Sequence, residues 1–201
     1  IPGLEENYFH SAGFGFVRKD FTLGNEFELD GVSFEGPAQS ITYLPFNAEY
    51  NGQLLTEQSF HALRLGLNFN FAGMLPGGTK ADFQNLRGGD RPGNPVNGDY
   101  QVFAWSLDWT QRLPAILMSL AAGHPVTPPP PPGGLDDDWT FHVTGRGQVA
   151  SQPLIVSEQF SAGGVASVRG YLEAEAFGDD AFNIQAELRS PYFRNFLGGY
   201  A

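Results

Sequence analysis

The stretch 157–171 combines a single cation with small, apolar and aromatic residues. That cation is Arg169; Gly163 and Gly164 precede it and Gly170 follows it. Glycine allows backbone conformations that other residues rarely adopt, and lets the chain pass close to a neighbouring surface. A guanidinium that is withdrawn from water needs a carboxylate partner, which its planar fork of N–H donors fits. The composition therefore predicts a loop that folds back on the protein and packs, with Arg169 as the single cation at its tip.

An ordered set of short motifs surrounds Arg169. The motifs are Gly147–Leu154, Glu158–Phe160, Gly163-Gly164, Val168-Arg169-Gly170-Tyr171, Gly178-Asp179 and Glu187–Pro191. Together they resemble the long-loop signature of the TpsB outer-membrane transporters of two-partner secretion. These are also called haemolysin secretion/activation proteins and belong to the superfamily that includes BamA. A four-residue match alone would be weak, whereas the ordered set over about fifty positions is specific.

The resemblance implies a fold and a function. Members of the family are bacterial outer-membrane β-barrels of about sixteen strands, and they export a large exoprotein, such as a haemolysin or an adhesin, through the lumen. Their long loop folds into the barrel, where its arginine pairs with an aspartate of a later strand. The residues that the resemblance assigns to this loop are Val168, Arg169, Gly170 and Tyr171 in the motif, with Glu158, Phe160, Gly163 and Gly164 in the fold-back. We expect the aspartate to lie beyond residue 201.

The composition excludes several other functions. The 201 residues include 11 Lys and Arg against 22 Asp and Glu, a net charge of −11, which disfavours binding to nucleic acid. The chain has no cysteine, its four histidines are scattered, and no nucleophile motif or placed carboxylate pair indicates an enzyme. The run 136–138 lacks the spaced ligands of a calcium loop, and the Gly145-x-Gly147 match to a dinucleotide motif lies within an alternating segment. We therefore expect no cofactor, metal, nucleotide or catalytic residue.

Apolar and polar residues alternate along much of the chain. The strictly alternating segments are 63–71, 103–110, 139–149 and 182–189, and the less regular ones are 14–18, 27–34 and 41–50. A period of two predicts β-strands with one apolar and one polar face. Changes of phase at Gly31 and Pro45 suit a bulge and a kink. We predict an all-β fold: an antiparallel, up-and-down transmembrane β-barrel, present in part as about seven strands, with a long inward-folded loop.

The two faces of these segments differ in composition. The polar face carries charges of both signs, as a water-filled lumen would. Its candidate lumen-facing residues are Arg64, Asp108, His142, Arg146, Glu187 and Arg189, and Arg112 shares their face. The opposite face is rich in Phe, Trp and Leu, which suits contact with lipid. Aromatic residues predicted near strand ends suggest an interfacial belt, namely Tyr100, Trp105, Trp109, Trp139 and Tyr192.

Long and short connections are expected to alternate, because outer-membrane barrels have long external loops and short periplasmic turns. Segments 74–99 and 151–180 are long, whereas 51–60 and 190–192 are short. The exception is 113–138, which is predicted to be an insertion into a tight turn, since Leu113 and Trp139 would otherwise nearly adjoin. Its proline run 128–132 is predicted to be a stiff, extended connector. We expect residues 1–201 to be one partial barrel of a longer protein. That protein would also carry periplasmic domains and the remaining strands.

Two alternatives remain open from the sequence. A BamA-like insertase shares the loop motif but inserts barrels into the membrane. A soluble β-sandwich, acting as a binding module or adhesin, shares the period of two, but it would bury the apolar rows between two sheets. Independence from detergent would favour the sandwich.

Overall fold

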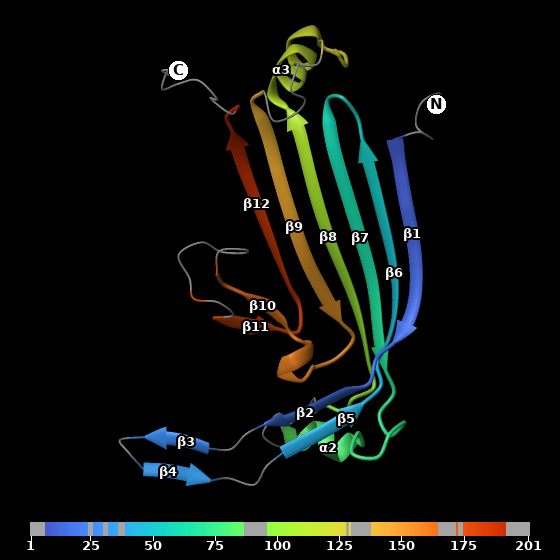
Figure 1. The fold of residues 1–201 in the computed structure, drawn as a ribbon, viewed down its shortest axis with the longest axis vertical. Helices are drawn as coiled ribbons and strands as arrows, with labels where there is room; N and C mark the ends of the chain where they lie inside the picture. Colours follow the sequence, from blue (N-terminus) through green and yellow to red (C-terminus); the bar gives the residue numbers. More distant parts are fainter. Residues whose placement is uncertain are drawn as a thin grey trace, which may run out of the picture.

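One six-stranded antiparallel sheet dominates the structure (Figure 1). The computed structural model describes residues 7–23, 26–29, 32–35, 39–86, 96–127, 129, 138–164, 172 and 175–191. The strands of the sheet, in spatial order, are β1 (Tyr8–Phe16), β6 (Phe46–Leu55), β7 (Ser59–Asn70), β8 (Tyr100–Arg112), β9 (Thr140–Ala150) and β12 (Ala181–Arg189). The spatial order follows the chain, because the other strands lie in connections between these six.

The six strands are long, at 9 to 13 residues each. Strands of soluble domains are usually about 5–6 residues, whereas a tilted strand needs about 9–11 residues to cross a bilayer. The four strictly alternating segments lie in β7, β8, β9 and β12, so the prediction of strands there is confirmed. The lengths of all six suit a membrane-spanning wall.

The register gives the sheet one polar and one apolar face. Residues that pair directly across antiparallel strands point to the same side of the sheet. One row across the strands reads Ser11, Asn51, Arg64, Ser106, Arg146 and Asn183. The adjacent row, which points to the other side, reads His10, Gly52, Leu63, Leu107, Gly145 and Ile184. We call these two sides the polar face and the apolar face.

The apolar face is open in the described part of the chain. Phe14 is 70% exposed and Phe182 is 73% exposed, at opposite edges of the sheet. A β-sandwich would bury such side chains between two sheets. This exposure contradicts the sandwich alternative.

The connections differ in length at the two ends of the sheet (Figure 1). Three long ones gather at one end, which we call the loop end. They contain β2 (Lys19–Leu23) with β5 (Gln39–Tyr43), β3 (Glu26–Leu29) with β4 (Val32–Glu35), α2 (Lys80–Leu86), the 3₁₀ turn η2 (Val156–Glu158), and β10 (Phe160–Ala162) with β11 (Ala176–Gly178). At the other end, the turn end, only residues 56–58 join β6 to β7, and α3 (Leu113–Ala122) follows β8. Long and short connections therefore alternate as expected, with 113–138 as the exception.

The hydrophobic core of the described residues lies at the loop end. It consists of Ile41, Tyr43, Phe83, Val96, Tyr100, Val102, Leu154 and Ile155, each at most 5% exposed. These residues come from β5, α2, β8, the chain just before β8 and the chain before η2, so the core joins all three long connections to the end of the wall. Burial of so many large side chains makes the loop end a packed unit.

The less regular segments differ from the prediction in detail. Segment 27–34 is not one bulged strand: it divides between β3 and β4, which pair with each other outside the wall. Segment 41–50 divides at Pro45 into β5 and β6. Segment 14–18 contributes the end of β1, which begins at Tyr8. The wall therefore has six strands in the described chain, because residues 26–35 belong to a connection.

Part of the insertion is helical, which the sequence analysis did not predict; the proline run 128–132 lies outside the described residues except for Pro129. Pro114 lies in the first turn of α3, where its missing N–H costs no hydrogen bond. Gly123 ends the helix with φ 72°, and its N–H donates to the Ser119 carbonyl at 3.0 Å. As expected, the ends of the insertion adjoin, since the Leu113 N–H donates to the Trp139 carbonyl at 2.8 Å. No helix in the described part of the chain is long and apolar enough to cross a membrane.

The aromatic belt is only partly as predicted. Trp109 and Trp139 lie near the turn end, and Trp139 is 43% exposed. Trp105 instead lies in the middle of β8, where its ring covers Gly145 and Gly147 on β9. Tyr100 is buried in the core at the loop end, and Tyr192 lies outside the described residues.

Candidate functional site

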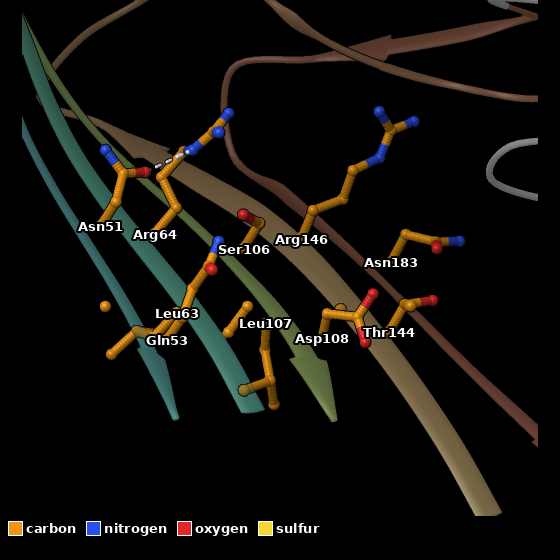
Figure 2. Close-up of a pocket in the computed structure, with 13 residues that line it drawn as sticks. Asn51, Gln53, Leu63, Arg64, Ser106, Leu107, Asp108, Thr144, Arg146 and Asn183 are labelled. Carbon is orange, nitrogen blue, oxygen red and sulfur yellow. Dashed lines mark hydrogen bonds between the residues drawn. The ribbon is translucent and has the colours of Figure 1, made fainter. Parts of the chain in front are cut away.

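The polar face forms a hollow in the middle of the wall (Figure 2). Its volume is about 380 Å³, and polar side chains from β6, β7, β8, β9 and β12 line it. Arg64, Ser106 and Arg146 rise from three neighbouring strands on the same side of the sheet. Arg64 Nε donates to Asn51 Oδ1 at 2.8 Å. The guanidinium groups of Arg64 and Arg146 therefore lie in the same cross-strand row of the polar face, on either side of Ser106.

A network of charged and polar side chains continues this face toward the turn end. His142 is 8% exposed, and its Nε2 lies 3.1 Å from Asp108 Oδ1. The His142 Nδ1 atom lies 3.9 Å from Glu187 Oε2, which accepts hydrogen bonds from Arg189 at 3.0 and 3.2 Å. The six residues predicted to face the lumen therefore share one face. Arg64, Asp108 and Arg146 line the hollow, and His142, Glu187 and Arg189 lie closer to the turn end.

The long connection between β9 and β12 lies against this polar face. Arg146 Nη2 donates to the Ser161 carbonyl at 3.3 Å, and the guanidinium carbon is 5.1 Å from the centre of the Phe160 ring. Gln148 Nε2 donates to the carbonyls of Glu158 and Asp179 at 3.2 and 3.0 Å. Both side chains belong to β9 and point to the polar side. The connection is therefore held over the wall at its two ends, before and after the 165–171 segment.

A carboxylate links this long connection to the one between β1 and β6. Glu158 Oε1 accepts a hydrogen bond from Lys19 Nζ at 2.5 Å and another from the Tyr43 hydroxyl. The Glu158 side chain is 11% exposed, so the interaction is shielded from solvent. Burial, followed by the nearby Glu158 carboxylate, raises the pKa of Tyr43. Tyr43 therefore stays protonated and donates to Glu158.

The two glycines of the fold-back have backbone conformations that suit glycine. Gly163 has φ 118° and Gly164 has φ 85°. A Cβ atom on Gly163 would lie 2.2 Å from the Leu172 carbonyl oxygen, so any other residue would force the backbone apart. The motif Val168-Arg169-Gly170-Tyr171 lies outside the described residues. Its four roles stay predictions.

Comparison with known proteins identifies the family. The sequence matches the family described as haemolysin secretion/activation protein ShlB/FhaC/HecB over residues 47–200. The chain belongs to this family. The solved structure of CdiB from Escherichia coli is similar in fold, with a TM-score of 0.56 at 17% sequence identity. The match covers 90% of this chain and 27% of the CdiB chain, so the chain spans about a quarter of that protein's length. A search among curated proteins gave no significant match.

Membership in the haemolysin secretion/activation family confirms the resemblance drawn from the motifs around Arg169. The likeness to CdiB confirms the predicted fold class, an antiparallel β-barrel present in part. The described strands do not close into a barrel, since β1 and β12 are the two edges of the sheet.

A buried ion pair at the turn end is a feature of this family member that sequence reasoning missed. Arg112 is 4% exposed, and its Nε and Nη2 donate to Asp138 Oδ2 at 2.9 and 2.6 Å. Its Nη1 donates to Gln58 Oε1 at 2.7 Å and to the Pro129 carbonyl at 3.1 Å. One guanidinium therefore holds the 56–58 turn and both ends of the insertion. We name Arg112, Asp138, Gln58 and Pro129 the turn-end clamp.

The described part of this family member also contains no cluster of three or more His, Asp or Glu that could hold a metal ion. The 136–138 acidic run contributes Asp138 to the turn-end clamp, and residues 136 and 137 lie outside the described chain. Glu158 and Asp138 are thus two shielded carboxylates, with side chains 11% and 16% exposed, and each joins distant segments of the chain.

Proposed function

We propose that the protein is part of an outer-membrane pore that secretes a large exoprotein by two-partner secretion. The observation that carries this proposal is the long connection held over the polar face of a wall whose other face is open and apolar. This arrangement suits a barrel of this family in which the protein's own long loop occupies the lumen at rest. In this proposal, export depends on the loop staying anchored to the wall.

The two faces support a membrane position. An apolar face with Phe14 and Phe182 exposed is stable in lipid and costly in water. The polar face would line the lumen through Arg64, Asp108, His142, Arg146, Glu187 and Arg189, whose mixed charges keep it hydrated. A hydrated lumen lets an unfolded polypeptide pass without a continuous hydrophobic trap. No nucleotide is needed in this proposal, because folding of the exoprotein outside the cell draws it outward.

Arg169 is the proposed anchor of the loop tip. Replacing it with alanine in the full-length protein is expected to reduce export about tenfold, which corresponds to a loss of only ~1.4 kcal/mol from loop docking. The measurement is the amount of exoprotein in the medium and in the periplasm of cells that make both proteins. The amount of folded barrel, measured by its altered electrophoretic mobility without heating, should stay at the wild-type level.

The control for Arg169→Ala is Arg18→Ala, which removes an exposed cation from the start of another long connection. This control is expected to export normally. Normal export by Arg169→Ala would refute the anchor role. Absence of exoprotein from the medium of wild-type cells would refute the pore itself.

A further inference from the structure

Helix α3 exposes an apolar surface that carries no charge. Leu117 is 55% exposed, Met118 45% and Leu120 75%. No Asp, Glu, Lys or Arg occurs from Leu113 to Thr127. Each such side chain left in water lacks the stabilisation that burial of its apolar surface would give. A ten-residue helix with this composition is poorly suited to a purely aqueous environment.

The segment after α3 folds back along the helix to form a compact unit. The Val126 N–H donates to Ser119 Oγ at 2.9 Å, and that hydroxyl lies 3.4 Å from the Val126 carbonyl. A hollow of about 660 Å³ lies between this unit and the end of the wall. Its walls include Ile116, Leu120 and Val126 on one side and Trp109 on the other. We name residues 113–127 the apolar rim.

The apolar rim is continuous with the apolar face of the wall. Trp109 and Gln111, which line the hollow, alternate with Asp108 and Thr110 and so point to the apolar side of β8. Trp139, which is 43% exposed, adjoins the start of α3 through its carbonyl. Trp side chains prefer the boundary between the headgroups and the acyl chains of a bilayer. The rim thus adjoins two tryptophans, Trp109 and Trp139, at the turn end of the wall.

We propose that the apolar rim is a lipid-binding anchor, with α3 lying in the interface of the membrane leaflet at the turn end. Its ligand is phospholipid, whose acyl chains cover Leu117, Met118 and Leu120. The proposal rests on the membrane position of the wall given above. The turn-end clamp supports it, because Arg112 and Asp138 fix both ends of the insertion to the wall and limit how far α3 can move from it.

The absence of charge makes the anchor unusual and testable. Interfacial helices commonly use Lys and Arg to bind anionic lipids. The apolar rim has neither, so its insertion depends on apolar area alone. Insertion should therefore be insensitive to salt and to the anionic lipid content of the membrane.

The test uses single cysteines. Residues 1–201 contain no cysteine, and any cysteine elsewhere in the full-length protein is replaced with serine. Leu120→Cys, Glu57→Cys and Ile184→Cys in the full-length protein each receive an environment-sensitive fluorophore. The proteins are placed in phosphatidylcholine vesicles with or without phosphatidylglycerol. Glu57 is an exposed residue of the neighbouring turn, and Ile184 lies on the apolar face of β12. Quenching is measured with nitroxide-labelled lipid and with aqueous iodide.

At position 120 we expect strong quenching by the lipid probe and protection from iodide, unchanged by phosphatidylglycerol or salt. At position 57 we expect strong quenching by iodide and little quenching by the lipid probe. Accessibility of position 120 to iodide, as at position 57, would overturn the anchor. Protection from both quenchers would also overturn it, because it would show that protein covers α3. If the lipid probe quenches neither position 120 nor position 184, the proposed membrane position of the wall is also refuted. If it quenches position 184 but not position 120, only the anchor proposal is refuted.

Discussion

Replacing Arg112 with alanine is expected to lower the free energy of unfolding by about 3–5 kcal/mol, because it leaves Asp138 without its cation in a largely buried position. The two side chains are 5% and 16% exposed, so solvent screens their interaction only weakly. The change also removes the donor to Gln58 Oε1 and to the Pro129 carbonyl. The measurement is urea unfolding of the full-length protein in vesicles, followed by tryptophan fluorescence.

The matched control for Arg112→Ala is Arg18→Ala. Arg18 pairs with Asp20 at a similar distance, 3.0 Å, but these side chains are 65% and 55% exposed, so little stability should be lost. A second variant, Arg112→Leu with Asp138→Leu, removes both buried charges and should regain much of the loss. The prediction is wrong if Arg112→Ala unfolds at the same urea concentration as Arg18→Ala.

Replacing Glu158 with alanine is expected to reduce export by about 10- to 100-fold, which corresponds to a loss of ~1.4–2.8 kcal/mol from loop docking. The carboxylate accepts hydrogen bonds from Lys19 and Tyr43, and so joins two long connections in a shielded position. Without it both donors lose this acceptor, and the connection between β9 and β12 is released from the anchored position on which export depends. Export is measured as exoprotein in the medium relative to folded barrel.

Two further measurements separate loop release from misfolding of the barrel. Glu158→Ala should increase protease cleavage within 151–180 while leaving the urea midpoint of the wall nearly unchanged. Glu57→Ala, which removes an exposed carboxylate from the short turn, should change neither quantity. Normal export despite rapid cleavage within 151–180 would show that Glu158 positions the loop without any part in secretion.

Alternation predicted the wall well because the period of two is a local signal. Leu63 to Phe69 and Phe182 to Arg189 each need only their own sequence to show which side chains share a face. Pairing then carries the pattern across the sheet, so Arg64, Asp108 and Arg146 lie on one side. The motifs around Arg169 predicted the family, although that arginine lies outside the described residues.

The helical part of the insertion was missed because residues 113–122 show no convincing helical period. Two signals for a helix were present: proline in the first turn and glycine after the last. The period of apolar residues in α3 is weak, since the helix is apolar on most sides, and a helix without a polar face shows little periodicity. That same feature distinguishes the proposed anchor from an ordinary surface helix.

The partners of Glu158 and Arg112 could not be predicted from sequence. Glu158 is separated from Lys19 by 139 positions and from Tyr43 by 115, so no local pattern links them. Arg112 is 26 residues from Asp138 and 54 from Gln58. Contacts of this kind depend on how the connections pack at each end of the sheet. Only the structure places them.

The most direct test of the account is the alternation of environments along β12 in a membrane. Single cysteines at Phe182, Asn183, Ile184 and Gln185 of the full-length protein are labelled in vesicles and exposed to lipid-attached and aqueous quenchers. The account predicts lipid quenching at 182 and 184 and aqueous quenching at 183 and 185, since these pairs lie on opposite faces. Equal aqueous quenching at all four positions, or protection of 182 and 184 from both quenchers, would contradict it.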